Sequence, residues 1–342
     1  MALAPSDIEF RRFALHIAAI LTVPVEDRTA KSFAGESLLR EDGVRSYAKT
    51  DLLGANLLER TLLRLGPVAT QQPTVLPNGS PFDHVIPSRS PGSTAFMDAW
   101  EKSISSYISG GADVLVLVRV GTYTDLDYAE LLSFHSSTGS PLTQAYDADG
   151  SLDIAVVNAS LLRNNDGLVR RALRRLFPQQ RRFYYTGYVN RLRRPPDLFS
   201  LMSDGLHGRC GLRPSGTELR PGVWCGDDVD LDSTVSIHGT AFIGAGSRVA
   251  AGCTIAGTSS VERDCQIDCA TLIEDSFVLQ GSYVGVALDV RRSIVGNKKL
   301  FNVDRNVEVS VSDSRLLGRN SKPIGFYDGL LSLLGGEVRA GD

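Results

Sequence analysis

The chain has 342 residues, a formal net charge of −3 at pH 7 and five cysteines. This length is enough for two domains with cores of their own, and the small net charge identifies no partner for the chain as a whole. An odd number of cysteines fits a reducing compartment better than a disulfide-stabilised secreted protein, so we expect a cytoplasmic location. The apolar run at 13–24 is too short to span a bilayer and follows acidic residues, which predicts neither a signal peptide nor a membrane span.

The first two hundred residues alternate helical and extended patterns. The run at 114–120 is apolar except for Arg119, which is typical of a strand buried on both faces. Strands and helices in this order and spacing favour an α/β sheet with parallel neighbouring strands. The predicted helices are 56–65, 97–108 and 126–135, and the predicted strands are 114–120, 142–146 and 152–157.

An arginine-rich segment follows these elements. Between 167 and 196 there are nine arginines and no acidic residue. Over 168–177 the apolar residues share one helix face and the arginines the other. A solvated basic face would explain this pattern, and the functional alternatives are an anion site or docking to an acidic partner. No nucleic-acid recognition fold accompanies the segment, so we expect no nucleic-acid partner. The arginines predicted to meet a protein partner are Arg170, Arg171, Arg174 and Arg175.

The C-terminal part contains aliphatic residues at an unbroken spacing of six. This period fits neither a helix nor an ordinary strand, but it fits a coil of eighteen residues with three flat sides, each turning one aliphatic side chain inward. Two shorter runs, at 223–235 and 288–300, keep the same period with an offset. The stretch resembles the left-handed parallel β-helix of hexapeptide-repeat proteins. The predicted inward positions are Ile237, Ile243, Val249, Ile255, Val261, Ile267, Ile273 and Leu279.

An α/β sheet followed by such repeats resembles the sugar-1-phosphate nucleotidylyltransferases, with the mannose-1-phosphate guanylyltransferases and glucose-1-phosphate adenylyltransferases nearest in layout. Residues 54–62 are similar to the family's G-K-P-L-L-E-x-T-L helix start, and 187–188 with 195–198 are similar to its G-Y-W-x-D-I-G-T-P-E-D-Y motif. Residues 114–117, 125–127 and 131–135 are similar to its central strand and D-x-D-L-x-x-L-L-x-F-H helix. The resemblance implies a reduced, Rossmann-like nucleotidyltransferase domain over 1–204, a β-helix over 221–315, and a tail over 316–342 with a short helix.

The resemblance also implies a defined set of catalytic groups. Family members use a glycine-rich loop for the triphosphate, a basic side chain and two aspartates that hold Mg²⁺. The loop has no counterpart before Arg60, and Lys49 is the only candidate for the basic group. The aspartate positions are matched by 118–120 and by Arg191. Two unit charges roughly 4 Å apart interact by about 4 kcal/mol at an effective dielectric near ~20, so Arg191 would repel the cation.

We therefore expect no metal site and no cofactor, unless Asp125 or Asp127 takes over the metal position. Both aspartates are predicted to be helix-start residues that favour the positive end of the helix dipole. The resemblance implies a role in nucleotide-sugar or polysaccharide metabolism as a binding, regulatory or scaffold subunit, either as a homo-oligomer or with an active homologue. The predicted ligand-binding residues are Arg119, Asp125, Asp127, Tyr188 and Arg191.

Two enzymatic alternatives remain open. An active sugar-phosphate nucleotidylyltransferase would use Lys49 and Mg²⁺. A hexapeptide-repeat acyltransferase would use a histidine as general base. His238 is the only histidine inside the repeat, and because it follows the inward Ile237 we expect it to point outward.

Overall fold

The computed structural model describes residues 15–23, 47–77, 94–163 and 169–320. Its contacts divide the chain into two compact units. Unit 1 contains 1–24, 61–120 and 126–186, and unit 2 contains 25–60, 121–125 and 187–342. The units therefore alternate along the chain, whereas the sequence predicted a single boundary between 204 and 221. Within the described ranges, no helix is long and apolar enough to cross a membrane.

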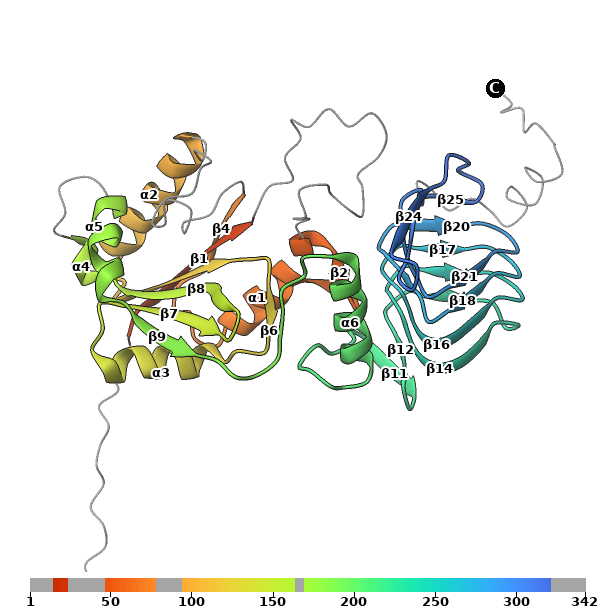
Figure 1. Cartoon of the computed structure of the whole chain (residues 1–342), viewed down its shortest axis with the longest axis horizontal. Helices are drawn as coiled ribbons and strands as arrows, with labels where there is room; N and C mark the ends of the chain where they lie inside the picture. Colours follow the sequence, from red (N-terminus) through yellow and green to blue (C-terminus); the bar gives the residue numbers. More distant parts are fainter. Residues whose placement is uncertain (1–14, 24–46, 78–93, 164–168, 321–342) are drawn as a thin grey trace, which may run out of the picture. The chain divides into compact units, whose positions relative to one another are not determined.

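The centre of unit 1 is a mixed sheet with strand order β4-β1-β5-β8-β7-β9 (Figure 1). All neighbouring strands are parallel except at β8, which is antiparallel to both β5 and β7. The expectation of parallel neighbours is wrong at β8, because only two residues connect β7 to β8 and such a short turn joins antiparallel strands. The strands are β1 (Ile17–Val23), β4 (Thr74–Pro77), β5 (Val114–Arg119), β7 (Leu142–Asp147), β8 (Gly150–Asn158) and β9 (Arg181–Tyr184).

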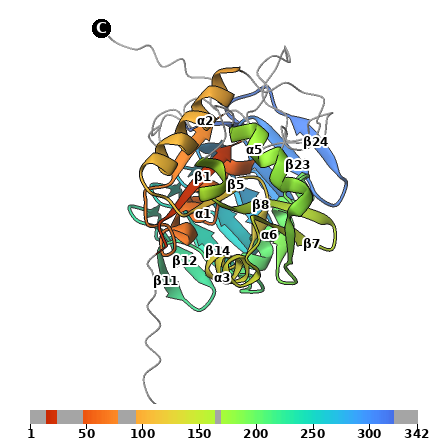
Figure 2. The ribbon, with the colours of Figure 1, turned by 90° about the vertical axis from the view of Figure 1, so that its left-hand side faces the viewer.

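Helices cover both faces of this sheet (Figures 1 and 2). One face packs against α2 (Thr94–Ser109), α4 (Ser160–Arg163) and α5 (Val169–Leu176), and the core between them includes Trp100. The other face contacts α3 (Tyr128–Thr138). The predicted helices at 97–108 and 126–135 are confirmed, with bounds shifted by one to three residues.

Helix α1 (Leu57–Leu65) confirms the helix predicted at 56–65. Its start is fixed by reciprocal hydrogen bonds. Glu59 N donates to Asn56 Oδ1 at 2.9 Å, and Asn56 N donates to Glu59 Oε2 at 2.9 Å. Such pairs satisfy amides that the first helical turn leaves without partners.

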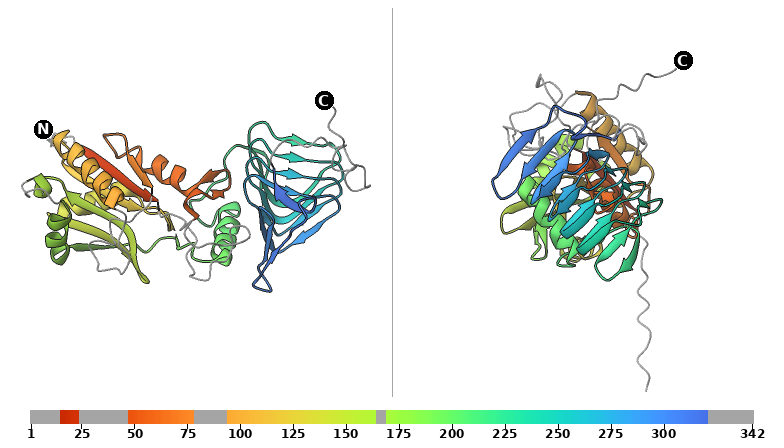
Figure 3. Two further views of the ribbon diagram at one scale, coloured as in Figure 1. Left: turned by 90° about the horizontal axis from the view of Figure 1, so that it is seen from above. Right: turned by 90° about the vertical axis from the view of Figure 1, so that its right-hand side faces the viewer.

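Unit 2 consists mainly of short parallel strands that pair from one repeat to the next (Figure 3). Ile237 pairs with Ile255 and Ile255 with Ile273, which is an offset of eighteen residues at each step. The paired strands are β12 (Val223–Cys225), β13 (Asp230–Leu231), β14 (Ser236–Ile243), β15 (Arg248–Val249), β16 (Thr254–Val261), β17 (Gln266–Ile267), β18 (Leu272–Glu274), β19 (Phe277–Val278), β20 (Ser282–Val284), β21 (Asp289–Arg291) and β22 (Ser293–Gly296).

The predicted inward ladder is confirmed from Ile243 to Ile273, where every sixth residue is at most 1% exposed. Ile237 is half-buried and packs against the same core. Beyond Ile273 the prediction is wrong, because Val278 rather than Leu279 continues the ladder and pairs with Val261.

The cause is a shorter corner. Residues 257–259 of one repeat lie opposite only 275–276 of the next, so the offset falls from eighteen to seventeen. Asp275 turns this corner with a positive φ of 43°. The shift also places Val284, Val290 and Val295 in the core cluster. Of the aliphatic residues predicted at 288–300, Leu288 and Leu300 are partly buried and pack against this cluster.

Antiparallel strands terminate the parallel stack. β11 (Thr217–Arg220) pairs with β12, and β23 (Lys299–Asn302) pairs with β22 and with β24 (Val307–Ser310). β25 (Leu317–Arg319) closes the second sheet against β20. The short helix predicted within 316–342 lies largely outside the described residues, and the described part of that tail contains β25.

The remaining elements of unit 2 come from distant parts of the sequence. They are η1 (Tyr47–Lys49), the hairpin β2 (Asp51–Leu52) and β3 (Ala55–Asn56), the pair β6 (Tyr123–Thr124) and β10 (Val189–Asn190), and α6 (Pro195–Leu206). Helix α6 contacts β14 and β16. Its Phe199 ring lies 4.7 Å from that of Phe277, so the outer surface of the stacked strands is also covered there.

Candidate functional site

One face of the unit 1 sheet changes from apolar to polar along the strands. Leu115 and Leu117 of β5 are buried in the core beneath α2 and α5. Arg119 lies on the same face two residues further on, because side chains alternate along a strand. It is paired in register with Thr22 of β1. The change occurs at the carboxyl ends of parallel strands, where open α/β sheets bind ligands.

Arg119 forms an ion pair across the sheet. Its Nη1 lies 3.5 Å from Asp153 Oδ2 of β8, and the two side chains are 31% and 33% exposed. Asp153 has a positive φ of 58°, and its amide donates to Ser151 Oγ at 3.0 Å. Aspartate tolerates this left-handed conformation better than most residues, although an L-residue there costs about 1 kcal/mol. The strained position sets Asp153 opposite the end of β5.

A chain of side-chain contacts continues from this pair to the edge of the sheet. The Gln144 amide donates to Ser151 Oγ at 2.7 Å, and the Tyr146 hydroxyl donates to Gln144 Oε1 at 3.1 Å. The Arg182 guanidinium lies 4.9 Å from the centre of the Tyr146 ring. The Tyr184 ring lies 6.3 Å from the Tyr146 ring. We call this set the polar band, and its members are Arg119, Asp153, Ser151, Gln144, Tyr146, Arg182 and Tyr184.

The polar band has the chemistry of an anion site. It contains two guanidinium groups against one carboxylate, so its formal charge is positive. Arginine offers a planar fork of donors that fits phosphate or carboxylate oxygens. The tyrosine rings can contact a sugar or base. Among the described residues, no group of three or more histidine, cysteine, aspartate or glutamate side chains could hold a metal ion.

The predicted ligand-binding residues are divided between the two units. Arg119 and Asp127 belong to unit 1, whereas Asp125, Tyr188 and Arg191 belong to unit 2. Asp127 caps α3 and accepts a hydrogen bond from Ala129 N at 2.8 Å, as expected of a helix-start residue.

The helix-start prediction is wrong for Asp125. Its carboxylate accepts hydrogen bonds from the Tyr123 hydroxyl at 2.8 Å and from Gly211 N at 2.7 Å. Asp125 therefore fixes a loop of unit 2, which sequence spacing could not show because its partner is 86 residues away.

Tyr188 also makes contacts within unit 2. Its hydroxyl donates to Asp204 Oδ2 at 2.7 Å, and Arg209 Nε donates to the other oxygen at 2.7 Å. Burial and the neighbouring Asp204 raise the pKa of Tyr188. These contacts attach Tyr188 to α6. Arg191 directly follows β10 in the same unit, and its side chain is half-buried.

The two candidates for catalysis are both in unit 2. Lys49 is exposed at the end of η1, and its carbonyl accepts a hydrogen bond from Gln280 Nε2 at 3.0 Å. His238 is exposed in β14, as the alternation after Ile237 predicted. The structure brings no member of the polar band into the same unit as these two residues.

The arginines of α5 form the exposed face of an amphipathic helix. Ala172 and Leu173 are 2% exposed and belong to the core of unit 1, whereas Arg171, Arg174 and Arg175 are exposed. The predicted division of this helix into an apolar and a basic face is confirmed. Arg170 lies on the same helix, but its side chain is outside the described residues.

Most of the polar band was not predicted from the sequence. Gln144 and Asp153 are polar residues within the predicted strands 142–146 and 152–157, which is the signal that could have found them, whereas Ser151 lies just before the second of these strands. Their partners lie on different strands, so the signal has no meaning without the strand order.

The fold and this site define a mixed α/β protein with parallel sheets and a basic, partly aromatic surface. The surface is formed at the carboxyl end of β5, the first half of the antiparallel β8, and the adjoining parts of β7 and β9. No protein-family model matches the sequence, and no curated protein matches it.

Proposed function

We propose that unit 1 binds a sugar phosphate or nucleotide sugar at the polar band and does not transfer nucleotidyl groups. On this proposal the chain is a nucleotidylyltransferase-like binding, regulatory or scaffold protein of nucleotide-sugar metabolism. The observation that supports it is the position of Arg119. In the enzymes that the sequence resembles, a metal-binding aspartate follows the central strand, whereas β5 ends here in an arginine.

The local electrostatics support ligand binding without metal catalysis. Among the described residues, the carboxylate that pairs with Arg119 is that of Asp153, at 3.5 Å from the guanidinium. A divalent cation would have to displace that guanidinium and would meet its charge nearby. A phosphate group instead gains an arginine donor and competes only with Asp153, whose side chain is partly solvated. A fixed cation can thus replace Mg²⁺ in holding phosphate, but it provides no Lewis acid.

We also infer that unit 2 is a left-handed parallel β-helix of the hexapeptide-repeat type. The support is the offset of eighteen residues between paired strands and the single aliphatic residue that each side contributes to the core. Such repeats commonly stack into rigid scaffolds. An experimental structure with right-handed connections between the paired strands would contradict this inference.

Ligand binding can be tested by thermal unfolding of the full chain. The ligands are UDP-glucose, GDP-mannose and ADP-glucose, each with Mg²⁺ or with EDTA. At about one hundred times Kd, a bound ligand adds about 2.7 kcal/mol to stability, which is a readily measured rise in Tm. We expect a rise with at least one of the three, and we expect it to persist in EDTA.

Matched variants locate the effect. Arg119→Ala should abolish the rise, whereas Arg171→Ala, which removes an exposed arginine of α5, should leave it unchanged. Equal losses in both variants would indicate general electrostatics and would contradict a site at Arg119. Arg191→Ala tests the predicted unit 2 residue in the same assay.

The absence of nucleotidyl transfer is tested separately. We expect no pyrophosphate release from any common nucleoside triphosphate with glucose-1-phosphate or mannose-1-phosphate in the presence of Mg²⁺. Release that EDTA abolishes would contradict this part of the proposal and would mean that another carboxylate holds the metal.

A further inference from the structure

The outer edge of strand β9 has backbone groups available for pairing. Among the described residues β9 pairs only with β7, in parallel register. Tyr185 N donates to Tyr146 O at 2.7 Å, which shows that the backbone groups of Phe183 and Tyr185 point toward β7. Successive residues of a strand direct these groups to opposite sides. Those of Arg182 and Tyr184 therefore point to the open edge.

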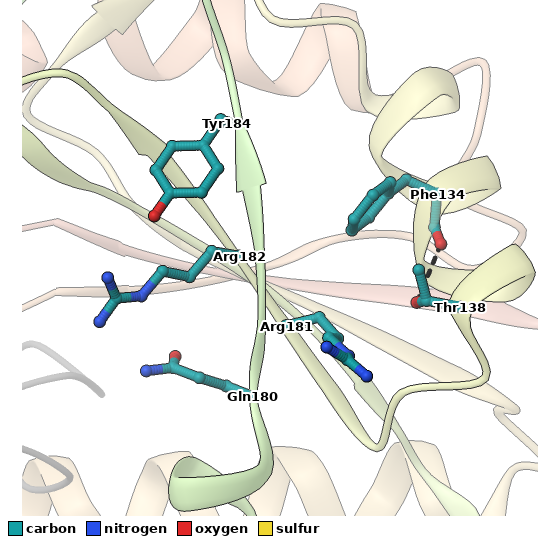
Figure 4. A pocket seen from close by; sticks show the side chains of 6 residues that line it. All are labelled: Phe134, Thr138, Gln180, Arg181, Arg182 and Tyr184. Atoms are coloured by element: carbon teal, nitrogen blue, oxygen red, sulfur yellow. Dashed lines mark hydrogen bonds between the residues drawn. The ribbon is translucent and has the colours of Figure 1, made fainter.

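A shallow pocket of about 590 Å³ surrounds this edge. Its lining comes from both sides of the strand, as Figure 4 shows. A compact ligand would contact one side of the sheet only. An added strand directs alternate side chains to both sides, so this lining fits an extended chain along β9. Gln180, Arg182 and Tyr184 lie on one side, and Phe134, Thr138 and Arg181 on the other.

The charge of this edge indicates what such a chain must contain. Arg181 and Arg182 are both exposed, and no acidic residue occurs between 167 and 196. The Tyr184 ring is 64% exposed beside them. The buried Oε1 of Gln180 accepts no hydrogen bond from the described residues, so it is available to a donor.

We propose that β9 binds an extended acidic segment of a partner protein by adding it as a further strand of the unit 1 sheet. Backbone groups of the segment pair with those of Arg182 and Tyr184. Carboxylates on two successive residues of the segment point to opposite sides, so one pairs with Arg181 and the other with Arg182. This interaction goes beyond the proposed function, since it uses the edge of the sheet and a macromolecular partner.

Two other occupants fit the edge less well. A second copy of the chain would place one arginine-bearing β9 against another, and like charges on directly paired strands are destabilising. A single-stranded nucleic acid would use the charge and the tyrosine ring. It would leave the open backbone groups of Arg182 and Tyr184 without strand partners, and it does not explain a lining on both sides.

Fluorescence anisotropy with the full chain tests the proposal. The probe is a fluorescein-labelled ten-residue peptide in which pairs of glutamates alternate with pairs of valines, so that carboxylates point to both sides of the added strand. Its matched control is the same peptide with every backbone amide N-methylated, which retains the charges and removes the N–H donors. We expect saturable binding of the first peptide and binding at least about tenfold weaker for the second, a difference of about 1.4 kcal/mol.

Arg182 and Tyr184 belong both to this surface and to the polar band, so the two proposals are separated by variants of Arg181 and Arg119, each of which belongs to only one of them. Arg181→Glu should weaken peptide binding about tenfold or more, and Arg305→Glu, an exposed arginine of unit 2, should not. Far-UV circular dichroism checks that both variants are folded. Arg181→Glu should retain the rise in Tm with nucleotide sugar, and Arg119→Ala should retain peptide binding, so either proposal can fail alone.

Three results would overturn the strand-addition proposal. They are no saturable binding of the acidic peptide, equal binding of the N-methylated peptide, and tighter binding of a ten-nucleotide oligothymidylate than of the peptide. The second result would mean that charge alone is recognised, and the third that the edge binds nucleic acid.

Discussion

Glu262 in unit 2 has no exposed surface and uses both carboxylate oxygens. Oε1 accepts from Leu53 N and from the Ser260 hydroxyl, each at 3.1 Å, and Oε2 accepts from Gly54 N at 2.8 Å. Because the carboxylate has two acceptor oxygens, it satisfies the backbone amides of both Leu53 and Gly54. A shorter side chain, or one with a single acceptor, would leave a buried amide without a partner. At the scale of the residue, this carboxylate fixes the turn between β2 and β3.

Glu262 should make stability depend on pH. Burial raises its pKa from 4.5 to about 7, so the folded protein binds the proton more tightly than the unfolded chain does. Its contribution is therefore fully present below about pH 4.5 and is lost as the pH rises through about 7, by about 3 kcal/mol at most. We expect Glu262→Gln to remove this pH dependence in urea unfolding between pH 5 and 8. Glu130→Gln, at an exposed position, is the control, and an unchanged slope in Glu262→Gln would contradict the assignment.

His135 should show the opposite dependence. It is 2% exposed, and its ring nitrogens lie 2.8 Å from Thr143 Oγ1 and 3.0 Å from Asn158 Oδ1. Burial lowers its pKa below 6.5, so the unfolded chain binds the proton first and the contribution of His135 is lost as the pH falls below about 6.5. His135→Phe should weaken this acid sensitivity and cost about 1–3 kcal/mol at pH 7.5, because the buried Thr143 and the half-buried Asn158 lose their hydrogen bonds to the ring.

Trp100 fluorescence provides the measurement, since this residue lies in the core of unit 1 and the other tryptophan, Trp224, lies in unit 2. Replacing Trp224 with phenylalanine leaves Trp100 as the reporter. Identical midpoints for the His135→Phe variant and its parent at pH 5.5 and at pH 7.5 would mean that this histidine contributes nothing.

At the scale of the element, the corners of the repeats determine the register of unit 2. The corner opposite residues 257–259 has one residue fewer, and every later parallel pairing is offset by seventeen instead of eighteen. Backbone also passes close to backbone at other corners. A Cβ on Gly244 would lie 2.5 Å from Arg263 N and 2.6 Å from the Glu262 carbonyl carbon. Because both contacts are with backbone, rotation of a side chain cannot relieve them.

Gly244→Ala should therefore destabilise unit 2 by about 1–3 kcal/mol, as expected for overpacking against a rigid neighbour. The reporter is Trp224 fluorescence in a Trp100→Phe background. Gly121→Ala is the matched control, because a Cβ there meets no atom within 4 Å. If the two alanine variants unfold at the same urea concentration, the close approach at Gly244 is not a constraint.

At the scale of the whole molecule, each unit is assembled from separated stretches of sequence. Unit 2 joins residues 47–60 to the repeats through Asp51 and Arg263, which are 212 positions apart. Arg263 donates to both oxygens of Asp51 at 2.6 Å, and the Asp51 side chain is only 2% exposed. Within the same segment, the half-buried Arg60 donates to the carbonyls of Leu52 and Ala55.

A double-mutant cycle should detect this long-range connection. Asp51→Ala and Arg263→Ala should each lower the stability of unit 2, and their effects should be coupled by about 1–3 kcal/mol because the pair is forked and partly buried. Trp224 fluorescence in the Trp100→Phe background measures each variant. The exposed pair Asp313 and Arg315 provides a cycle in which we expect a coupling below about 1 kcal/mol. Strict additivity at Asp51 and Arg263 would contradict the proposed connection.

The sequence by itself determined features that depend on local periodicity. The helices at 56–65, 97–108 and 126–135 and the buried ladder from Ile243 to Ile273 were predictable, because each has a constant period of burial along one stretch of chain. The amphipathic face of α5 was predictable for the same reason. The role of Asp127 followed from its position just before a helix.

The tertiary structure alone decided features that depend on partners distant in sequence. The antiparallel direction of β8, the seventeen-residue repeat after Val261 and the partners of Asp125 were all missed. The polar band is of the same kind, since Arg119, Ser151 and Arg182 meet only because β5, β8, β7 and β9 are neighbours in that order. Local sequence fixes which side chains share a face of one strand, but strand order is fixed by the burial of all faces together, and the candidate site is formed at that level.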